Sequence, residues 1–198
     1  DDYNDYYQAE LSTFPLYGNI LYIKKDTNGI KICPAEIMVK SDKTNSVNTF
    51  KRDHNNNHFL YPERFDTLSI YEQELPYFDA EKSNIHLLQN LVGTPIWRQN
   101  LPLPSYTLVK YSTPLDTVLR RMMHLSDNTL AEHLLLSAGM VLTDSLSLSN
   151  TIFVANSKLM LDLPQRLIWV DGSGLSRYNR STPASILEIL KKMYDEIQ

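Results

Sequence analysis

Two closely spaced prolines, Pro102 and Pro104, divide the chain into halves whose hydrophobic patterns differ. Proline fixes φ and cannot donate a backbone hydrogen bond, so neither a helix nor a central strand can run through this segment. The residues before it carry the patterns of strands and loops, and the residues after it carry those of helices. We therefore expect an α/β fold of the α+β type, with a β-rich domain at residues 1–105 and a helical region at residues 106–198.

In the first half, β-branched and aromatic residues gather in short runs that turn signals separate. Residues 16–19 predict a turn, and Asp26-Thr27-Asn28-Gly29 predicts a hairpin, because Asn-Gly tolerates the positive φ of a tight turn. The candidate strands begin at Ile20, Ile30, Ile37 and Tyr71. Residues 79–92 have apolar side chains at helical spacing and are followed by Gly93, so they predict an amphipathic helix.

The second half predicts four amphipathic helices. The first begins after Pro114, the second runs from Ser126 to about Ala138, the third covers about residues 143–161, and the last opens at Pro183. Between the last two, residues 166–170 predict a short strand. In the last helix Glu188 and Lys192 are four residues apart, which predicts an ion pair on one face.

The composition excludes several classes of function. The formal net charge is −4 and no basic run exceeds two residues, so we expect no nucleic-acid partner, because phosphate recognition needs a concentrated positive surface. No stretch approaches the roughly 20 apolar residues that span a bilayer, so we expect no transmembrane segment. The single cysteine, Cys33, excludes an internal disulfide. The chain opens on Asp1-Asp2 without a Met or a signal peptide, and we expect it to be an internal fragment.

Ser126-Asp127-Asn128, between two expected helices, is the strongest chemical signal. A hydroxyl and an amide two residues apart at an interhelical turn can point into one cleft, where the hydroxyl relays a proton and the amide binds a substrate carbonyl. The alternative is a helix N-cap, because Ser, Asp and Asn are the preferred residues there. The three residues alone leave both interpretations open.

A second segment, Asp171-Gly172-Ser173-Gly174, follows the short expected strand. Such a sequence is typical of a tight turn. The residues that follow it, as far as Asn179, add Arg177 and several polar groups, which suit recognition of a carboxylate or a peptide.

Taken together, Ser126-Asp127-Asn128 and the segment at residues 171–179, which begins about 45 residues later, closely resemble the low-molecular-mass class C penicillin-binding proteins. These are serine-type D-alanyl-D-alanine carboxypeptidases and endopeptidases. Residues 6–12 and 112–115 also look like that family. The resemblance implies part of a penicillin-binding and β-lactamase-like transpeptidase domain, interrupted by a β-rich accessory domain. Residues 1–105 would then be part of the accessory domain, and residues 106–198 the helical part of the catalytic domain.

The resemblance also implies roles for single residues. Ser126 matches the family's proton-relay serine, and Asn128 matches the amide that binds the acyl side chain of the substrate. Asp2, Tyr7 and Arg177 match positions that line, in some relatives, the pocket for the free end of the peptidoglycan stem peptide. An aspartate there would pair with an amine and an arginine with a carboxylate. For Asp2, a solvated surface charge is the alternative.

Two of the family's three motifs are missing from the chain. No serine is followed by lysine at the third position, as the nucleophile motif requires, and no Lys-Thr-Gly or Lys-Ser-Gly occurs. We therefore expect the chain to be inactive alone, while the parent protein would bind β-lactams and hydrolyse stem peptides through an acyl-serine intermediate in the bacterial envelope, in the periplasm. A non-catalytic module that binds peptidoglycan or a protein is the alternative. A class A β-lactamase is disfavoured, because no Glu-x-x-Leu-Asn loop follows at the expected distance.

Metal chemistry has little support in the sequence. His54 and His58 flank a run of three asparagines, and no further ligands converge on this loop, so a solvated loop is the preferred interpretation. We expect no metal and no cofactor. The sequence says nothing of the oligomeric state.

Overall fold

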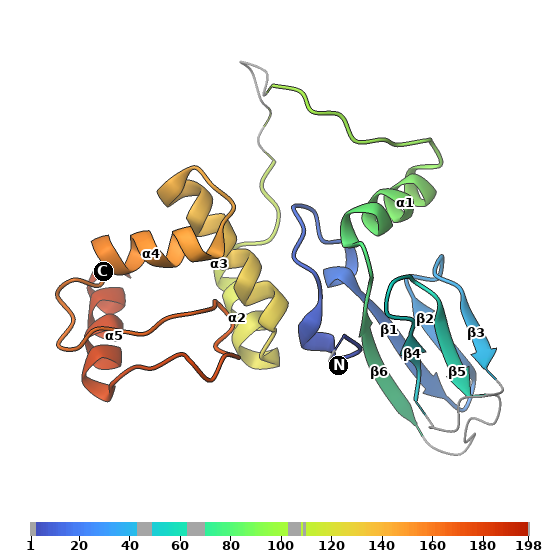
Figure 1. The fold of residues 1–198 in the computed structure, drawn as a ribbon, viewed down its shortest axis with the longest axis horizontal. Coiled ribbons are helices and arrows are strands. Elements are labelled where there is room, and N and C mark those ends of the chain that lie inside the picture. Colours follow the sequence, from blue (N-terminus) through green and yellow to red (C-terminus); the bar gives the residue numbers. More distant parts are fainter. Residues whose placement is uncertain (1–2, 43–48, 63–69, 103–107, 109, 198) are drawn as a thin grey trace. The chain divides into compact units, whose positions relative to one another are not determined.

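The computed structural model describes residues 3–42, 49–62, 70–102, 108 and 110–197. The chain forms two compact units, Asp1–Val109 and Lys110–Gln198, and each is described here by itself (Figure 1). Among the residues described, unit 1 contains the strands and one α-helix, and unit 2 contains four α-helices. The fold class predicted from the sequence, α+β, is confirmed. The expected linker at residues 101–104 falls partly outside the described residues. The assignment of the two halves to an accessory and a catalytic domain stays a prediction.

Unit 1 is built on two small sheets. In the first, β1 (Ile20–Asp26) pairs antiparallel with β2 (Gly29–Cys33) on one side and with β6 (Tyr71–Pro76) on the other. In the second, β5 (Phe59–Pro62) lies between β3 (Val39–Asp42), which is parallel to it, and β4 (Lys51–Arg52), which is antiparallel. Figure 1 shows both sheets in the blue to green part of the chain.

The core of unit 1 arises from the alternation of side chains along the strands. In β1, every second side chain is buried, as expected when one face of a strand packs inward. The buried apolar cluster joins both sheets to the helix that follows them. Its members are Leu21, Ile23, Phe50, Phe59, Leu75, Tyr77 and Leu87.

Two short 3-10 helices, η1 (Tyr6–Gln8) and η2 (Leu16–Asn19), precede β1, and α1 (Ala80–Val92) follows β6. Asp79 caps α1 by accepting a hydrogen bond from the Lys82 N–H, and Gly93 ends it with φ of 69°. The helix at 79–92 was therefore predicted correctly. Asn84 and Leu87 are buried on the inner face of this helix, whereas Val92 at its end is exposed.

In unit 2, α2 (Leu115–Leu125) leads directly into α3 (Asn128–Thr143), and α4 (Leu148–Lys158) packs on α3. The contact between α3 and α4 is close at Gly139, where an added Cβ would overlap the Thr151 side chain. A long connection, orange to red in Figure 1, leads from α4 to α5 (Pro183–Ile197). Ser185, in the first turn of α5, is buried and donates a hydrogen bond of 2.7 Å to the Gln165 carbonyl.

Several boundaries predicted in the second half were wrong. The second expected helix runs on to Thr143, where Asp144 ends it in a left-handed conformation with φ of 53°. The third begins only at Leu148, because Ser147 caps it by accepting a hydrogen bond from the Asn150 N–H. Residues 166–170 form no strand, and a single bridge pairs Ile168 with Arg180.

Two smaller expectations also fail. Lys192 does not pair with Glu188, because it forms an ion pair with Asp162, and Glu188 pairs with Lys191 at 3.5 Å. The strand expected from residue 37 begins at Val39. None of the helices in the described ranges is both long and apolar enough to cross a membrane.

Candidate functional site

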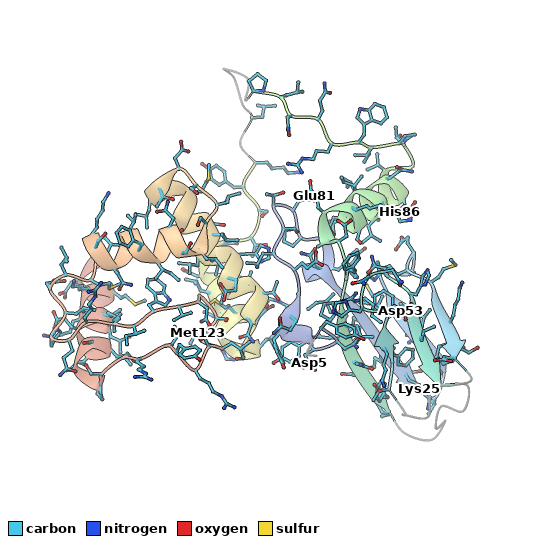
Figure 2. All side chains as sticks on the ribbon, viewed as in Figure 1. Asp5, Lys25, Asp53, Glu81, His86 and Met123 are labelled. Atoms are coloured by element: carbon cyan, nitrogen blue, oxygen red, sulfur yellow. The ribbon has the colours of Figure 1, made fainter. Side chains whose placement is uncertain are left out.

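Ser126 forms the joint between α2 and α3. It has φ of 53° and ψ of 45°, the left-handed conformation that commonly ends a helix. Its backbone N–H and that of Asp127 both donate hydrogen bonds to the Met122 carbonyl, which closes the last turn of α2. Met123, labelled in Figure 2, lies in this last turn. Because α3 begins at Asn128, the two helices meet with only Ser126 and Asp127 between them.

Asp127 alone caps α3. Its Oδ1 accepts a hydrogen bond of 2.9 Å from the Leu130 N–H. The cap foreseen at this segment is therefore present, but neither Ser126 nor Asn128 provides it. Within the part of the chain that the structure describes, the Ser126 hydroxyl and the Asn128 amide make no hydrogen bond. Ser126 is exposed and Asn128 is half-buried.

The loop after residue 170 is closed by hydrogen bonds among its own side chains. The Asp171 carboxylate accepts hydrogen bonds from the Gly174 N–H at 2.6 Å, the Ser176 N–H at 2.7 Å and the Asn179 amide at 2.9 Å. Asn179 in turn accepts the Val170 N–H at 2.8 Å. The side chains of Asp171 and Asn179 thus fix the conformation of the loop. The tight turn predicted at residues 171–174 is a bend in which the Asp171 side chain accepts the Gly174 N–H. The turn closed by a backbone hydrogen bond lies further on, where the Asn179 N–H donates to the Ser176 carbonyl at 3.1 Å.

Glu132 of α3 fastens this loop to the helix. Its carboxylate accepts hydrogen bonds from the Gly172 N–H and the Ser173 N–H, both at 3.1 Å, and from the Ser173 hydroxyl at 2.9 Å. A Cβ on Gly172 would lie 3.0 Å from the Ala131 carbonyl oxygen and 3.1 Å from Leu135 Cβ, so only glycine allows this approach without movement of the helix. Gly172 therefore packs directly on α3.

Sequence reasoning missed Glu132. Residues four apart lie on one face of a helix, about 6 Å apart along its axis, so Glu132 follows Asn128 on the same stripe of α3. That spacing was the available signal, but a glutamate in a helix is ordinary by itself. Only the contact with a loop 40 residues away gives it meaning.

Arg177 lies within the same closed loop. Its side chain is exposed and makes no hydrogen bond or ion pair with the described residues. Its guanidinium remains available to a ligand carboxylate, which is its predicted role.

The two remaining candidates belong to unit 1. Tyr7 lies in η1, and its hydroxyl donates a hydrogen bond of 2.6 Å to Asp5, which Figure 2 labels. Asp2 lies outside the described residues. Within unit 2, the structure attaches the loop of Arg177 to α3, the helix that begins at Asn128, through Glu132. It does not test the grouping of Ser126, Asn128, Arg177, Tyr7 and Asp2 in one site.

No group of three or more His, Cys, Asp or Glu side chains that could hold a metal occurs in the ranges described. In the loop where His54 and His58 were weighed as ligands, His54 contacts the Asn55 side chain at 2.6 Å. His58 lies 3.5 Å from the Asp53 carboxylate, which Figure 2 also labels.

The whole chain is similar to penicillin binding protein 4 (dacB) from Haemophilus influenzae in two crystal structures. One aligns over 98% of this chain and 49% of that chain, with a TM-score of 0.64 and 19% identity. The other, a complex with a novel β-lactam, aligns over 90% and 47%, with a TM-score of 0.58 and 20% identity. This chain therefore spans about half the length of those proteins, and it shares the fold of a penicillin-binding protein.

The sequence family is more specific than the fold. Residues 86–197, more than half of the chain, match the D-Ala-D-Ala carboxypeptidase 3 (S13) family, and the chain belongs to that family. No curated protein matches the chain. The resemblance to D-alanyl-D-alanine peptidases that bind penicillin, predicted from residues 126–128 and 171–179, is therefore confirmed.

Proposed function

We propose that this chain is part of a serine-type D-Ala-D-Ala carboxypeptidase or endopeptidase. The protein would cleave peptidoglycan stem peptides through an acyl-serine intermediate. Membership in the D-Ala-D-Ala carboxypeptidase 3 (S13) family supports the reaction class. It also favours the peptidase over a non-catalytic binding module.

The observation that carries the proposal is that Ser126, Asp127 and Asn128, three consecutive residues, have different roles in the structure. Asp127 provides the cap that α3 needs, so the hydroxyl of Ser126 and the amide of Asn128 are left for chemistry. A serine at this backbone conformation costs about 1 kcal/mol or more relative to glycine, the usual residue there. In our proposal Ser126 relays a proton and Asn128 binds the acyl side chain of the substrate.

The nucleophile must come from a Ser-x-x-Lys motif, and none occurs in these 198 residues. Lys-Thr-Gly is missing as well. The chain alone should therefore form no covalent adduct with a fluorescent penicillin, whereas the full-length protein should give a labelled band after denaturing electrophoresis. A labelled band from the chain alone would contradict this part of the proposal.

The test of the site compares Ser126→Ala with Asp127→Ala in the full-length protein. Ser126→Ala should lower kcat for D-Ala release about 100-fold or more, the scale of a positioned acid or base, with little change in stability. Asp127→Ala should instead lower the free energy of unfolding by about 1 kcal/mol, the usual value of a helix cap. Unchanged turnover in Ser126→Ala would reduce Ser126 to a residue that merely joins two helices.

We further propose that Arg177, with Tyr7 and Asp2, binds the free end of the stem peptide. Stem peptides and β-lactams would then be the ligands of the full-length protein, which would act in the periplasm of the bacterial envelope. The exposure of Arg177 and its lack of a hydrogen-bond partner among the described residues support this role.

A further inference from the structure

The loop that carries Arg177 is closed by hydrogen bonds among its own residues. Asp171 and Asn179 close it through side-chain hydrogen bonds of 2.6–2.9 Å. Ile168 and Arg180 close its base, with N–H to carbonyl distances of 3.0 and 2.8 Å. Such a loop can move as one piece. The position of Arg177 therefore depends on what holds the whole loop in place.

The loop docks on α3 at one place that the structure defines well. Two consecutive backbone N–H groups and one hydroxyl, from Gly172 and Ser173, donate to the Glu132 carboxylate. Hydrogen bonds to an ionised carboxylate are roughly twice as strong as those between neutral groups. Because Gly172 has no side chain, the backbone reaches the helix closely enough for these bonds to form.

The helix ties this docking point to the candidate site. Glu132 lies one turn beyond Asn128 on the same face of α3, about 6 Å along the axis. Asp127 fixes the start of that helix and Ser126 fixes the end of α2. A chain of contacts within unit 2 therefore runs from Ser126 through α3 and Glu132 to the loop of Arg177.

We propose that Glu132 is a positioning residue that sets the Arg177 loop relative to Asn128, and so determines recognition of the carboxylate at the free amino-acid end of the stem peptide. This inference rests on the proposed function, because it concerns the substrate of that site. Glu132 itself need not touch the substrate. It acts by holding the Gly172 and Ser173 amides.

The docking can be tested without activity, by amide hydrogen exchange in the full-length protein. Glu132→Gln keeps the size of the side chain but places an NH₂ group among donors, so Gly172 and Ser173 should exchange at least about tenfold faster. Glu188→Gln is the matched control, because it removes a carboxylate that pairs only with Lys191 on the helix surface in the described structure. The control should leave exchange at residues 172 and 173 unchanged.

The role in recognition is tested by steady-state kinetics on two substrates. Glu132→Gln should raise KM about tenfold for a stem peptide that keeps its free amino-acid end. It should change KM less than twofold for a short diacylated D-Ala-D-Ala peptide, which lacks that end and keeps only the C-terminal carboxylate common to both substrates. The double variant Glu132→Gln with Arg177→Lys should raise KM for the stem peptide no more than Arg177→Lys alone does. The effects of two substitutions that disturb one contact with the substrate are not additive.

An equal rise in KM for both substrates, or additive rises in KM in the double variant, would overturn the recognition role. Unchanged exchange at Gly172 and Ser173 would overturn the docking itself. If the wild-type full-length protein releases no D-Ala and binds no penicillin, the proposed function is wrong, and the exchange result alone then decides whether Glu132 holds the loop.

Discussion

The two units of this chain are held together by different means. Unit 1 has a closed apolar core in which Leu21, Phe50, Phe59 and their neighbours are almost fully buried. In the described part of unit 2, the buried apolar side chains are Ile152, Ala155 and Leu163. Burial of a large apolar side chain contributes about 1.5–3 kcal/mol, so unit 1 gains far more from its core than unit 2 does.

Unit 2 relies instead on polar contacts at the ends of its helices. Asp127 and Ser147 cap α3 and α4, and Glu132 and Asp171 hold the Arg177 loop. Ser185 ties α5 to the connection before it. These contacts fix geometry more than they add stability, because a hydrogen bond contributes only about 1 kcal/mol net. The comparison teaches that the candidate site is placed by hydrogen bonds rather than by a core.

The largest expected effect comes from opening the core of unit 1. Phe59→Ala should lower its free energy of unfolding by about 3–5 kcal/mol, because the lost side chain leaves a cavity between packed neighbours. The matched change in unit 2, Phe153→Ala, removes a ring that is 69% exposed and should cost less than about 0.5 kcal/mol. Urea unfolding followed by amide exchange in β1 and α4 measures both. A comparable loss in the two variants would remove the distinction between the units.

An intermediate effect is expected where unit 2 is packed most closely. Gly139→Ala would drive a methyl group into Thr151 and force α3 and α4 apart, at a cost of about 1–3 kcal/mol. Ser137→Ala, on an exposed position of the same helix, is the control and should be neutral or slightly stabilising, since alanine is the better helix former. Thermal unfolding of the two variants measures both effects. An unchanged melting temperature for Gly139→Ala would mean that α4 shifts without cost.

The contrast between a unit with an apolar core and a unit held by hydrogen bonds explains which elements could be predicted from the sequence. In unit 1, local patterns located the starts of β1, β2, β6 and α1 to within one residue, whereas β4 and β5 were not predicted. In unit 2, the break between the second and third helices was predicted at about residues 139–142, whereas it lies at residues 144–147, because a left-handed Asp144 and a Ser147 cap leave no gap in the apolar spacing. Residues 166–170 resemble a strand by composition, but no neighbouring strand pairs with them.

The candidate site divides in a similar way. Ser126 and Asn128 could be named from the sequence because they belong to a short motif, and the change of chain direction at residues 171–174 could be expected from their turn-forming composition. Glu132 could not be named, because its importance comes from a contact with Gly172 and Ser173 across 40 residues. The sequence also suggested Glu188 as the partner of Lys192, whereas Asp162 from the preceding connection takes that place. Contacts distant along the chain leave no local pattern.

The smallest expected effect concerns one surface ion pair in each unit. In unit 2, a hydrogen bond from the Lys192 ammonium holds the pKa of Asp162 below its usual range. In unit 1, a hydrogen bond from the Lys24 ammonium does the same for the pKa of Glu72, and the Tyr22 hydroxyl adds to it. All four charged groups are at least partly exposed, so solvent screens both pairs and each contributes little.

The sign of the effect follows from the direction of the shifts. A carboxyl whose pKa is lowered by folding contributes its stability above its unfolded pKa and loses it as the pH falls through the folded pKa. Lys192→Met should therefore return the pKa of Asp162 toward its ordinary value and make unit 2 slightly less sensitive to acid between neutral pH and about pH 3. Lys24→Met should do the same for Glu72 and unit 1. Carboxyl titration by NMR, with melting temperatures at neutral pH and at about pH 3, measures the two changes.

Because both ion pairs lie on the surface, we expect the two changes in acid sensitivity to be of similar size. The difference between the units would then come from the core of unit 1 and from the contacts of the Arg177 loop. A clearly larger loss in unit 2 would show that its surface charges, as well as the hydrogen bonds between Ser185 and Gln165, hold α5 in place.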